Sequence, residues 1–181
     1  RRMRWGASKE EFVRPVHWVV AMLGQDSDHG DILGLATGNT TRGHRFHSNG
    51  FIKLRRPEQY VSALADAKVV ACFEQRQQII RQQVEAQASA LGATAVIDSE
   101  LLDEVTGLVE WPVALTGSFE ARFLQVPPEA LISSMREHQK YFHVVDAAGT
   151  LKPHFITVAN IESSQPQQVI AGNERVIRPR L

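Results

Sequence analysis

Two histidines three positions apart lie in a stretch rich in groups that bind metal ions or phosphate. The segment from Thr40 to Gly50 reads TTRGHRFHSNG and contains His44, His47, Arg42 and Arg45. The flanking glycines disfavour a helix, and side chains at i and i+3 of a strand point to opposite faces. No carboxylate lies within six residues of the pair. Because a zinc site needs three or four ligands, we predict no metal site here.

The same loop suits two other roles. A basic, glycine-bounded loop can contact phosphate groups, which arginine binds without regard to base sequence. The glycine can equally serve the backbone geometry of a structural turn. The sequence leaves both interpretations open.

A second dense group of polar residues is SMREHQKYFHV, which spans 134–144. His138 continues the apolar stripe of Leu131 and Met135 on a predicted helix, which makes it a candidate core residue. Arg136 and Lys140 share another face of that helix, four positions apart. They can hold a phosphate or be solvated.

No catalytic motif is present. The sequence lacks GxSxG, the phosphate-binding GxxxxGK and GxGxxG. The single cysteine, Cys72, excludes an internal disulfide, and it is expected to be a small buried residue because no histidine is near it in sequence. Asp26, Asp28 and Asp31 do not fit a calcium loop, because the glycine and the distal glutamate are out of place. We therefore expect no catalytic residue and no bound cofactor or metal in this chain.

The elements that position these residues are strands and helices without a regular alternation. Residue patterns predict strands over 12–23, 32–38, 51–54, 68–71 and 118–126, and a hairpin over 141–160 turning at 147–149. Helical periodicity predicts helices over 57–67, 74–92, 99–109 and 127–139. The third helix should be capped at Asp98 or Ser99 and should bury Leu101, Leu102, Val105 and Leu108. This order predicts an α+β domain around a mixed sheet over 1–165, then a linker and the start of a helix over 166–181.

Composition and charge restrict the class of protein. The 181 residues are 43% hydrophobic and 22% charged, which is typical of a soluble globular domain. No apolar run approaches the roughly 18 residues of a membrane helix, and one cysteine fits a cytoplasmic location. Residues 1–56 carry ten basic and five acidic residues, whereas residues 57–131 carry four and eleven. A polyanion would therefore meet the ends of the chain rather than its middle.

Several stretches together resemble a known family. They are MRWG, RPVHW, GHRF, LLDEVTGLVEWP, FLQVPPEALISSMREHQKYF and GNERVIRPRL. Their types and order are similar to those of the bacterial glycine–tRNA ligase beta subunit, a much longer chain, so we expect an internal fragment. Pro179 departs from the family pattern, and proline can interrupt the final helix.

The resemblance implies an enzyme of two alpha and two beta chains. In that family the alpha subunit uses ATP and magnesium to activate glycine, and the beta subunit supplies tRNA binding. It also implies a domain similar in fold to the editing-type domain of the phenylalanine–tRNA ligase beta chain. We expect an accessory, tRNA-facing domain that is not catalytic alone, with the alpha subunit, a second beta subunit and the tRNA for glycine as partners, and no membrane. The tRNA-binding candidates are Arg42, His44, Arg45, His47, Arg136, Lys140, Arg175 and Arg178.

Two alternatives stay open at this stage. One is an architectural module for subunit assembly that makes no contact with RNA; scattered basic residues would favour it, and one shared exposed face would favour RNA. The other is hydrolytic editing, which is disfavoured because glycine is the smallest amino acid and its pocket can exclude competitors by bulk. Any RNA contact should be mainly to phosphates, because the sequence shows no cluster of aromatic residues.

Overall fold

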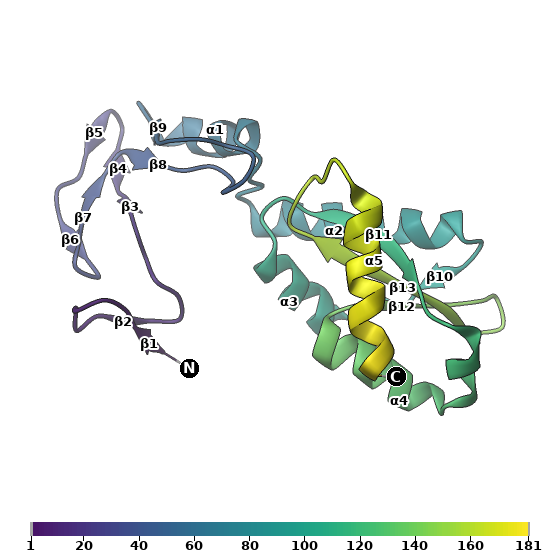
Figure 1. Cartoon of the computed structure of the whole chain (residues 1–181). Coiled ribbons are helices and arrows are strands. Elements are labelled where there is room, and N and C mark those ends of the chain that lie inside the picture. Colours follow the sequence, from purple (N-terminus) through teal and green to yellow (C-terminus); the bar gives the residue numbers. More distant parts are fainter. Residues whose placement is uncertain (1, 181) are drawn as a thin grey trace. The chain divides into compact units, whose positions relative to one another are not determined.

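The computed structural model describes residues 2–180, and its chain forms two compact units, Arg1–Ala71 and Cys72–Leu181. Figure 1 shows the elements of each unit along the chain. The division falls inside the predicted domain 1–165, and helix α5 (Pro166–Ile177) lies in the segment predicted as a linker and the start of the next helix. That 1–165 forms one domain stays a prediction.

The first unit consists of short strands followed along the chain by a helix. Strands β1 and β2, β4 and β5, and β8 and β9 form antiparallel pairs, and a mixed three-stranded sheet has the order β3-β7-β6. The 3-10 turn η1 (Pro57–Gln59) then leads into helix α1 (Tyr60–Asp66), which confirms the helix predicted over 57–67. The strands are β1 (Met3–Arg4), β2 (Glu11–Phe12), β3 (Val19–Val20), β4 (Met22–Leu23), β5 (Asp26–Ser27), β6 (Asp31–Ile32), β7 (Leu35–Gly38), β8 (Thr40–Thr41) and β9 (Ile52–Lys53).

Turns break two of the strands predicted in this unit. The strand predicted over 12–23 is wrong: much of it is irregular, and β4 turns back into β5 through Gly24 at φ +61°. The strand predicted over 32–38 is instead a tight hairpin, because Leu33 and Gly34 both adopt positive φ and reverse the chain. The strand predicted over 51–54 is confirmed as β9.

The strand predicted over 68–71 is also wrong. Lys68 has φ +62°, and the Val69 N–H donates to the Leu64 carbonyl oxygen at 2.8 Å. These features cap the C-terminus of α1. The residues that follow therefore belong to the end of the helix and its exit.

The second unit is a four-stranded sheet covered by helices. The strand order is β10-β12-β13-β11, and every pairing is antiparallel, so the prediction of a mixed sheet is wrong for this unit. With five α-helices and several small sheets among residues 2–180, the structure is α+β, as predicted. The elements are α2 (Phe73–Ala90), β10 (Thr94–Ala95), α3 (Ser99–Leu108), β11 (Val113–Ser118), η2 (Ala121–Gln125), α4 (Pro128–Ser133), the π-helix η3 (Ser134–Gln139), β12 (Phe142–Val145), β13 (Leu151–Ala159), α5 and η4 (Arg178–Arg180).

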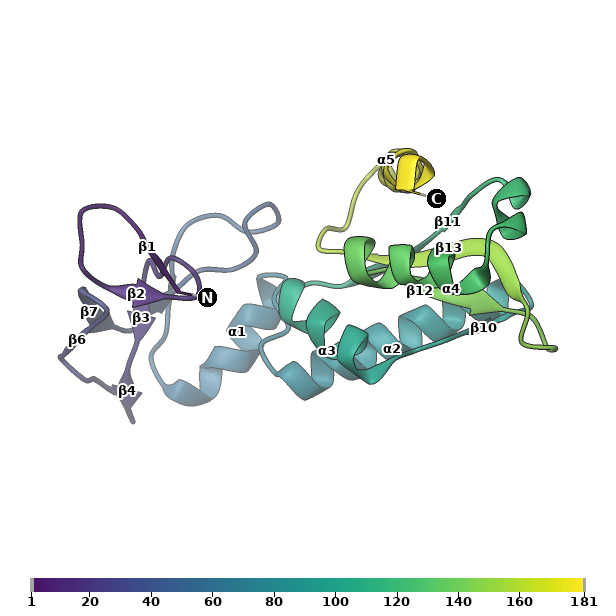
Figure 2. The ribbon, with the colours of Figure 1, turned by 90° about the horizontal axis from the view of Figure 1, so that it is seen from below.

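Helices cover both faces of this sheet (Figure 2). The neighbours Phe155 and Ile156 on β13 point to opposite faces, as alternation along a strand requires. Ile156 packs in a core with side chains of α2 and α3, and Phe155 packs in a second core with α4, η3 and the end of α5. Helix α5 ends at Ile177, which is buried in the second core, and Pro179 lies in the 3-10 turn beyond it.

The helices predicted over 74–92, 99–109 and 127–139 are confirmed. Asp98 caps α3 by accepting a hydrogen bond from the Leu101 N–H at 3.0 Å. Leu108 was wrongly predicted to be buried: it is 52% exposed, because the chain becomes extended at the next residue and buries Val109 instead. No helix among residues 2–180 has the length and apolar character needed to cross a membrane.

The strand predicted over 118–126 is wrong, because the strand lies earlier in the chain. Strand β11 pairs with β13 from Val113 to Ser118, and η2 follows. The apolar residues of η2, Phe123 and Leu124, pack against the second core from a 3-10 turn. The hairpin predicted over 141–160 is confirmed, with its turn closed by the Gly149 N–H donating to the Asp146 carbonyl oxygen at 3.0 Å.

Candidate nucleic-acid interface

The first predicted histidine, His44, holds the basic loop in place from inside the first unit. The His44 side chain is fully buried, and the backbone N–H of His44 donates to the Ala67 carbonyl oxygen at 2.8 Å. Its Nδ1 accepts from the Phe46 N–H at 3.2 Å, and its carbonyl oxygen accepts from the Ser48 N–H at 2.9 Å. The last two bonds hold the turn of the loop, and the first ties the loop to the end of α1, so His44 positions the loop from within the fold.

Gly43 lets the loop approach the end of α1. A Cβ on Gly43 would meet the side chain of Ala67 and would lie 2.7 Å from the Ala67 carbonyl oxygen and 2.7 Å from Ser48 Oγ. Contacts of this length do not occur in folded proteins, so only glycine fits here. Gly43 therefore serves close packing against the end of α1, and phosphate contact by the loop stays a prediction.

His47, the second predicted histidine, is partly buried beside the first. The ring centroids of His44 and His47 lie 4.7 Å apart. Within residues 2–180, no group of three or more His, Cys, Asp or Glu side chains is arranged to hold a metal ion. The absence of a bound metal stays a prediction.

The two arginines of the loop lie on its surface beside aromatic rings. The guanidinium carbon of Arg42 lies 4.1 Å from the centre of the Phe51 ring, and that of Arg45 lies 5.6 Å from the centre of the Phe46 ring. Both rings are open to solvent, at 61% and 70% exposed. The loop therefore presents two cation–aromatic pairs, a combination that binds both the phosphates and the bases of single-stranded nucleic acid. These aromatic partners were not predicted from the sequence.

A second group of cations, not singled out from the sequence, lies at the end of strand β9 and just after it. Lys53, Arg55 and Arg56 are exposed and line a polar pocket of about 530 Å³. Within residues 2–180 none of these three side chains, nor Arg42 or Arg45, pairs with a carboxylate. The signal that could have revealed this group is the basic run in IKLRRP. The rest of the pocket lining comprises Gln25, Asn39, Leu54 and Gln59.

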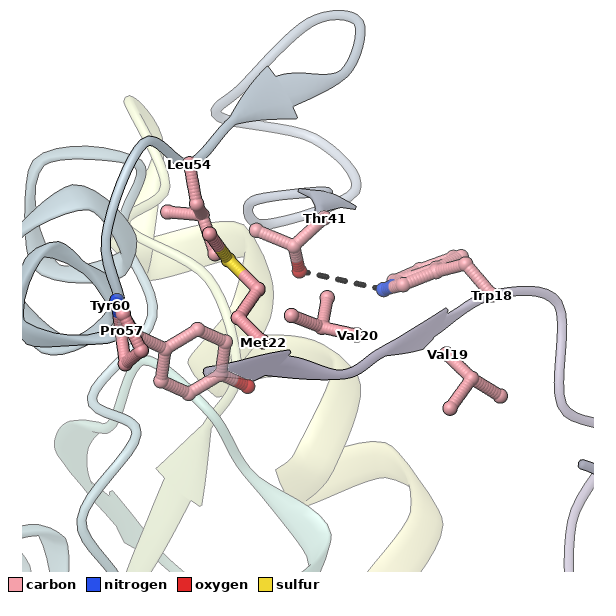
Figure 3. Close-up of a pocket in the computed structure, with 8 residues that line it drawn as sticks. All are labelled: Trp18, Val19, Val20, Met22, Thr41, Leu54, Pro57 and Tyr60. Atoms are coloured by element: carbon pink, nitrogen blue, oxygen red, sulfur yellow. Dashed lines mark hydrogen bonds between the residues drawn. The ribbon is translucent and has the colours of Figure 1, made fainter. Parts of the chain in front are cut away.

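An apolar pocket of about 530 Å³ also lies in the first unit (Figure 3). Trp18 stands at one end of it, and its indole Nε1 donates to Thr41 Oγ1 at 3.2 Å. Tyr60, from the first turn of α1, stands at the other end (Figure 3). The pattern around Trp18 had predicted a strand covered on both faces, so the pocket was missed. The remaining lining comprises Val19, Val20, Met22, Leu54 and Pro57.

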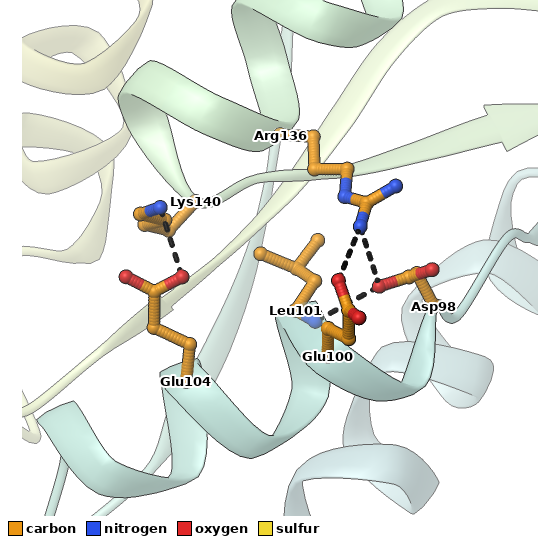
Figure 4. A network of polar contacts seen from close by, with 6 residues as sticks. All are labelled: Asp98, Glu100, Leu101, Glu104, Arg136 and Lys140. Carbon is orange, nitrogen blue, oxygen red and sulfur yellow. Dashed lines mark hydrogen bonds and ion pairs between the residues drawn. The ribbon is translucent and has the colours of Figure 1, made fainter.

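The basic candidates at the end of the π-helix in the second unit are paired with carboxylates (Figure 4). Arg136 Nη2 lies 3.1 Å from Asp98 Oδ1 and 3.2 Å from Glu100 Oε2, and Lys140 Nζ lies 2.9 Å from Glu104 Oε2. Helix α3 thus supplies counter-charges that reduce the attraction of this surface for phosphate.

The other predicted residues of the second unit differ in their surroundings. Arg178 Nε lies 3.1 Å from Glu120 Oε1, whereas Arg175 is exposed on α5. His138 was wrongly expected to be a core residue: it is exposed, because the π-helix turns the chain out of register with the α-helical stripe. Cys72 was expected to be buried, but it is exposed and its thiol lies 3.4 Å from Glu74 Oε2.

The titratable groups with shifted pKa in β12 and just before it do not mark a catalytic site. Burial raises the pKa of Tyr141 to about 12, and the Tyr141 hydroxyl donates to Asn173 Oδ1 at 2.6 Å. Burial lowers the pKa of His143 on β12. Both shifts come from burial within the fold. A functional group is usually marked by a shift that also involves a charged partner in a cleft.

Comparisons with known proteins agree on one family over the whole chain. The family model described as glycyl-tRNA synthetase beta subunit matches residues 1–181. The chain is similar to the glycine–tRNA ligase beta subunit of Chromohalobacter salexigens (62% identical over 181 residues) and to that of Hahella chejuensis (60% over 182 residues). It is also similar to that of Pseudomonas syringae pv. tomato (55% over 181 residues). Each alignment covers 100% of this chain and 26% of the relative, so the chain spans about a quarter of its relatives' length.

Proposed function

Because the chain belongs to the glycyl-tRNA synthetase beta subunit family, we propose that it is an accessory, tRNA-contacting part of an enzyme that joins glycine to its tRNA. In this proposal an alpha subunit uses ATP and magnesium to activate glycine, and this part of the beta subunit contributes no catalytic residue. Its partners are the alpha subunit, a second beta subunit and the tRNA for glycine. The assembled enzyme acts in the cytoplasm.

The observation that carries the proposal is a set of cations beside the β8–β9 pair that form no ion pair within residues 2–180. Strand β8 leads into the loop of Arg42 and Arg45, and strand β9 ends at Lys53 and leads into Arg55 and Arg56. All five side chains are exposed. Phosphate groups are the natural counter-charges, because guanidinium groups bind them through two parallel hydrogen bonds.

The contrast with the second unit supports this choice of surface. Its candidates Arg136, Lys140 and Arg178 each have a carboxylate within 3.2 Å. A phosphate would have to displace these carboxylates. The contact proposed for the first unit displaces none among residues 2–180.

An architectural role is the second candidate, and one observation favours it. The first unit has several large apolar side chains on its surface, although its buried apolar residues are few. Such side chains are typical of a surface that packs against another chain or segment. This role would be compatible with RNA contact by the basic loop, and it would stand alone if the loop made no such contact. The side chains are Met3, Phe12, Val13, Leu23 and Ile32.

Hydrolytic editing is the third candidate. Its support is the similarity in fold, which we also propose, between the second unit and the editing-type domain of the phenylalanine–tRNA ligase beta chain. The chemistry weighs against it, because a pocket for glycine excludes larger amino acids by bulk. Deacylation of alanyl- and seryl-tRNA of the glycine type at a rate above the buffer rate would establish this activity.

Charging kinetics of the full-length assembled enzyme test the proposed function. In the double variant Arg42→Ala, Arg45→Ala, we expect KM for tRNA to rise about tenfold or more, since each charged hydrogen bond is worth roughly 1.5–3 kcal/mol. ATP–pyrophosphate exchange with glycine should be unchanged. The double variant Arg136→Ala, Lys140→Ala is the matched control, because it also removes two positive charges, from side chains that already have carboxylate partners. An Arg42→Ala, Arg45→Ala variant with the KM of the wild type would refute the tRNA contact of this loop.

A further inference from the structure

The apolar pocket and the polar pocket of the first unit share a wall. Leu54, which is only 1% exposed, lines both of them. Each pocket has a volume of about 530 Å³, which is within the range of sites for small ligands or single residues. The two pockets differ sharply in chemistry: one has aromatic ends, and the other carries three positive charges.

The apolar pocket suits a flat aromatic group. Trp18 and Tyr60 stand at its opposite ends, with Met22 and Thr41 between them (Figure 3). Both rings are partly exposed, and the indole of Trp18 is held by its hydrogen bond to Thr41 Oγ1 at 3.2 Å. Proteins that bind unpaired RNA bases stack them on aromatic side chains, which is favourable for every base.

The polar pocket suits phosphate, and its backbone is fixed before any ligand binds. Asn39 and Leu54 exchange two hydrogen bonds: Asn39 Nδ2 donates to the Leu54 carbonyl oxygen at 3.1 Å, and the Leu54 N–H donates to the Asn39 carbonyl oxygen at 2.8 Å. Gln59 Oε1 accepts from the Arg55 N–H at 2.9 Å and from the Arg56 N–H at 3.3 Å. The chain that carries the cations is therefore ordered in advance, which lowers the entropic cost of binding an anion.

We propose that the first unit binds one unstacked nucleotide of an RNA strand, with its base in the apolar pocket and its phosphates against Lys53, Arg55 and Arg56. This inference rests on the proposed function, in which the chain contacts tRNA. An apolar side chain from another protein segment could fill the first pocket but would leave the three cations without a counter-charge. Charge complementarity therefore favours the nucleotide. A strand is favoured over a free mononucleotide because Arg42 and Arg45 offer further phosphate contacts beside the same strand pair.

Binding of short RNA to the full-length protein tests the inference. The probes are a labelled single-stranded RNA of six nucleotides, a fully abasic strand of the same length, and AMP as competitor. Tyr60→Ala and Trp18→Ala should weaken binding of the intact strand on the order of 5- to 150-fold, since a stacked base is worth roughly 1–3 kcal/mol. Both should also lose the preference for the intact strand over the abasic one. Tyr60→Phe, which keeps the ring, is the matched control and should bind as the wild type does.

The cations have a separate signature. Lys53→Ala or Arg55→Ala should weaken the intact and the abasic strand alike, and each should lower the dependence of log K on log salt by roughly 0.7. Tyr60→Ala should leave that slope unchanged. Base and phosphate are thus assigned to different pockets by different measurements.

Four outcomes would overturn the inference. In the first, Tyr60→Ala binds the intact strand with wild-type affinity; in the second, the wild type binds the intact and the abasic strand equally well. In the third, AMP displaces the RNA at the same concentration at which the RNA binds. In the fourth, the pocket variants lose subunit assembly but bind RNA as the wild type does. Because Tyr60 is partly exposed on α1, its variant stays informative even if Trp18→Ala unfolds. If Arg42→Ala weakens tRNA binding while the pocket variants do not, the pocket inference fails and the proposed function stands. If no variant weakens tRNA binding, the pocket inference and the proposed function both fail.

Discussion

Replacement of Gly43 by alanine should open the basic loop locally. The added methyl group would meet the side chain of Ala67, and it would lie 2.7 Å from the Ala67 carbonyl oxygen and from Ser48 Oγ. One of these neighbours is backbone at the end of a helix, which has little freedom to move away. Forcing a methyl group into such a contact costs roughly 1–3 kcal/mol.

A second cost of this substitution follows from the same contact. If the loop moves away from Ala67, the hydrogen bond from the His44 N–H to the Ala67 carbonyl oxygen, 2.8 Å long, is lost. Losing a buried hydrogen bond costs roughly 1 kcal/mol more. The free energy of opening of this segment should therefore fall by roughly 2–4 kcal/mol.

Hydrogen exchange of the full-length protein, read by mass spectrometry, measures this opening segment by segment. Peptides covering 40–50 and 63–70 should exchange about 30-fold faster or more in Gly43→Ala, since 1.4 kcal/mol corresponds to a factor of about ten. Gly38→Ala is the control, because a Cβ at Gly38 meets no atom within 4 Å. Equal exchange in the two variants would show that Gly43 is not needed for close packing.

Three further predictions concern the second unit and metal binding. Burial raises the pKa of Tyr141 from 10.0 to about 12, so between these pH values the folded chain keeps the phenol proton that the unfolded chain has lost. The free energy of unfolding should therefore fall as pH rises from 10 to 12. In urea melts over that range, Tyr141→Phe should lack this fall. Asp98→Ala should lower the free energy of unfolding by about 1 kcal/mol through loss of the cap on α3, and the exposed Glu100→Ala should change it little, so equal melts would contradict the capping role. A chelator should leave the melting temperature unchanged, and a large drop together with stoichiometric zinc would reveal a metal site.

The helices could be predicted from the sequence because their signals are local. Ile80, Val84 and Ala88 recur at helical spacing, and all three are buried in the core as expected. Gly92 follows at φ +62°, where glycine is favoured, and Asp98 starts the next helix with its side chain. Neither feature depends on contacts with distant residues.

The first unit could not be predicted as well, because its structure depends on pairs that are far apart in the chain. The role of Gly43 is set by Ala67, and the pocket is made by Trp18 and Tyr60 on separate elements. Two-residue strands carry too few residues for an alternating pattern. Turn residues with positive φ, such as Leu33, decide where each strand ends.

The candidate site shows the same limit. The sequence identified Arg42 and Arg45 as basic residues of a loop, and the structure places both of them at the surface. The sequence also identified Arg136 as a basic candidate. The carboxylates that pair with Arg136 lie on and just before another helix, and sequence spacing could not assign them to it. Which cations are free to bind phosphate therefore became visible only in the fold.

The salt dependence of tRNA binding tests the central claim most directly. Affinity of the full-length assembled enzyme for tRNA is measured over a series of salt concentrations for the wild type, the double variant Arg42→Ala, Arg45→Ala, and the control Arg136→Ala, Lys140→Ala. If the loop binds phosphates, the slope of log K against log salt falls by about one unit for each lost contact in the double variant and is unchanged in the control. A double variant that remains folded and keeps the wild-type affinity and slope would contradict the account and leave the architectural role in its place.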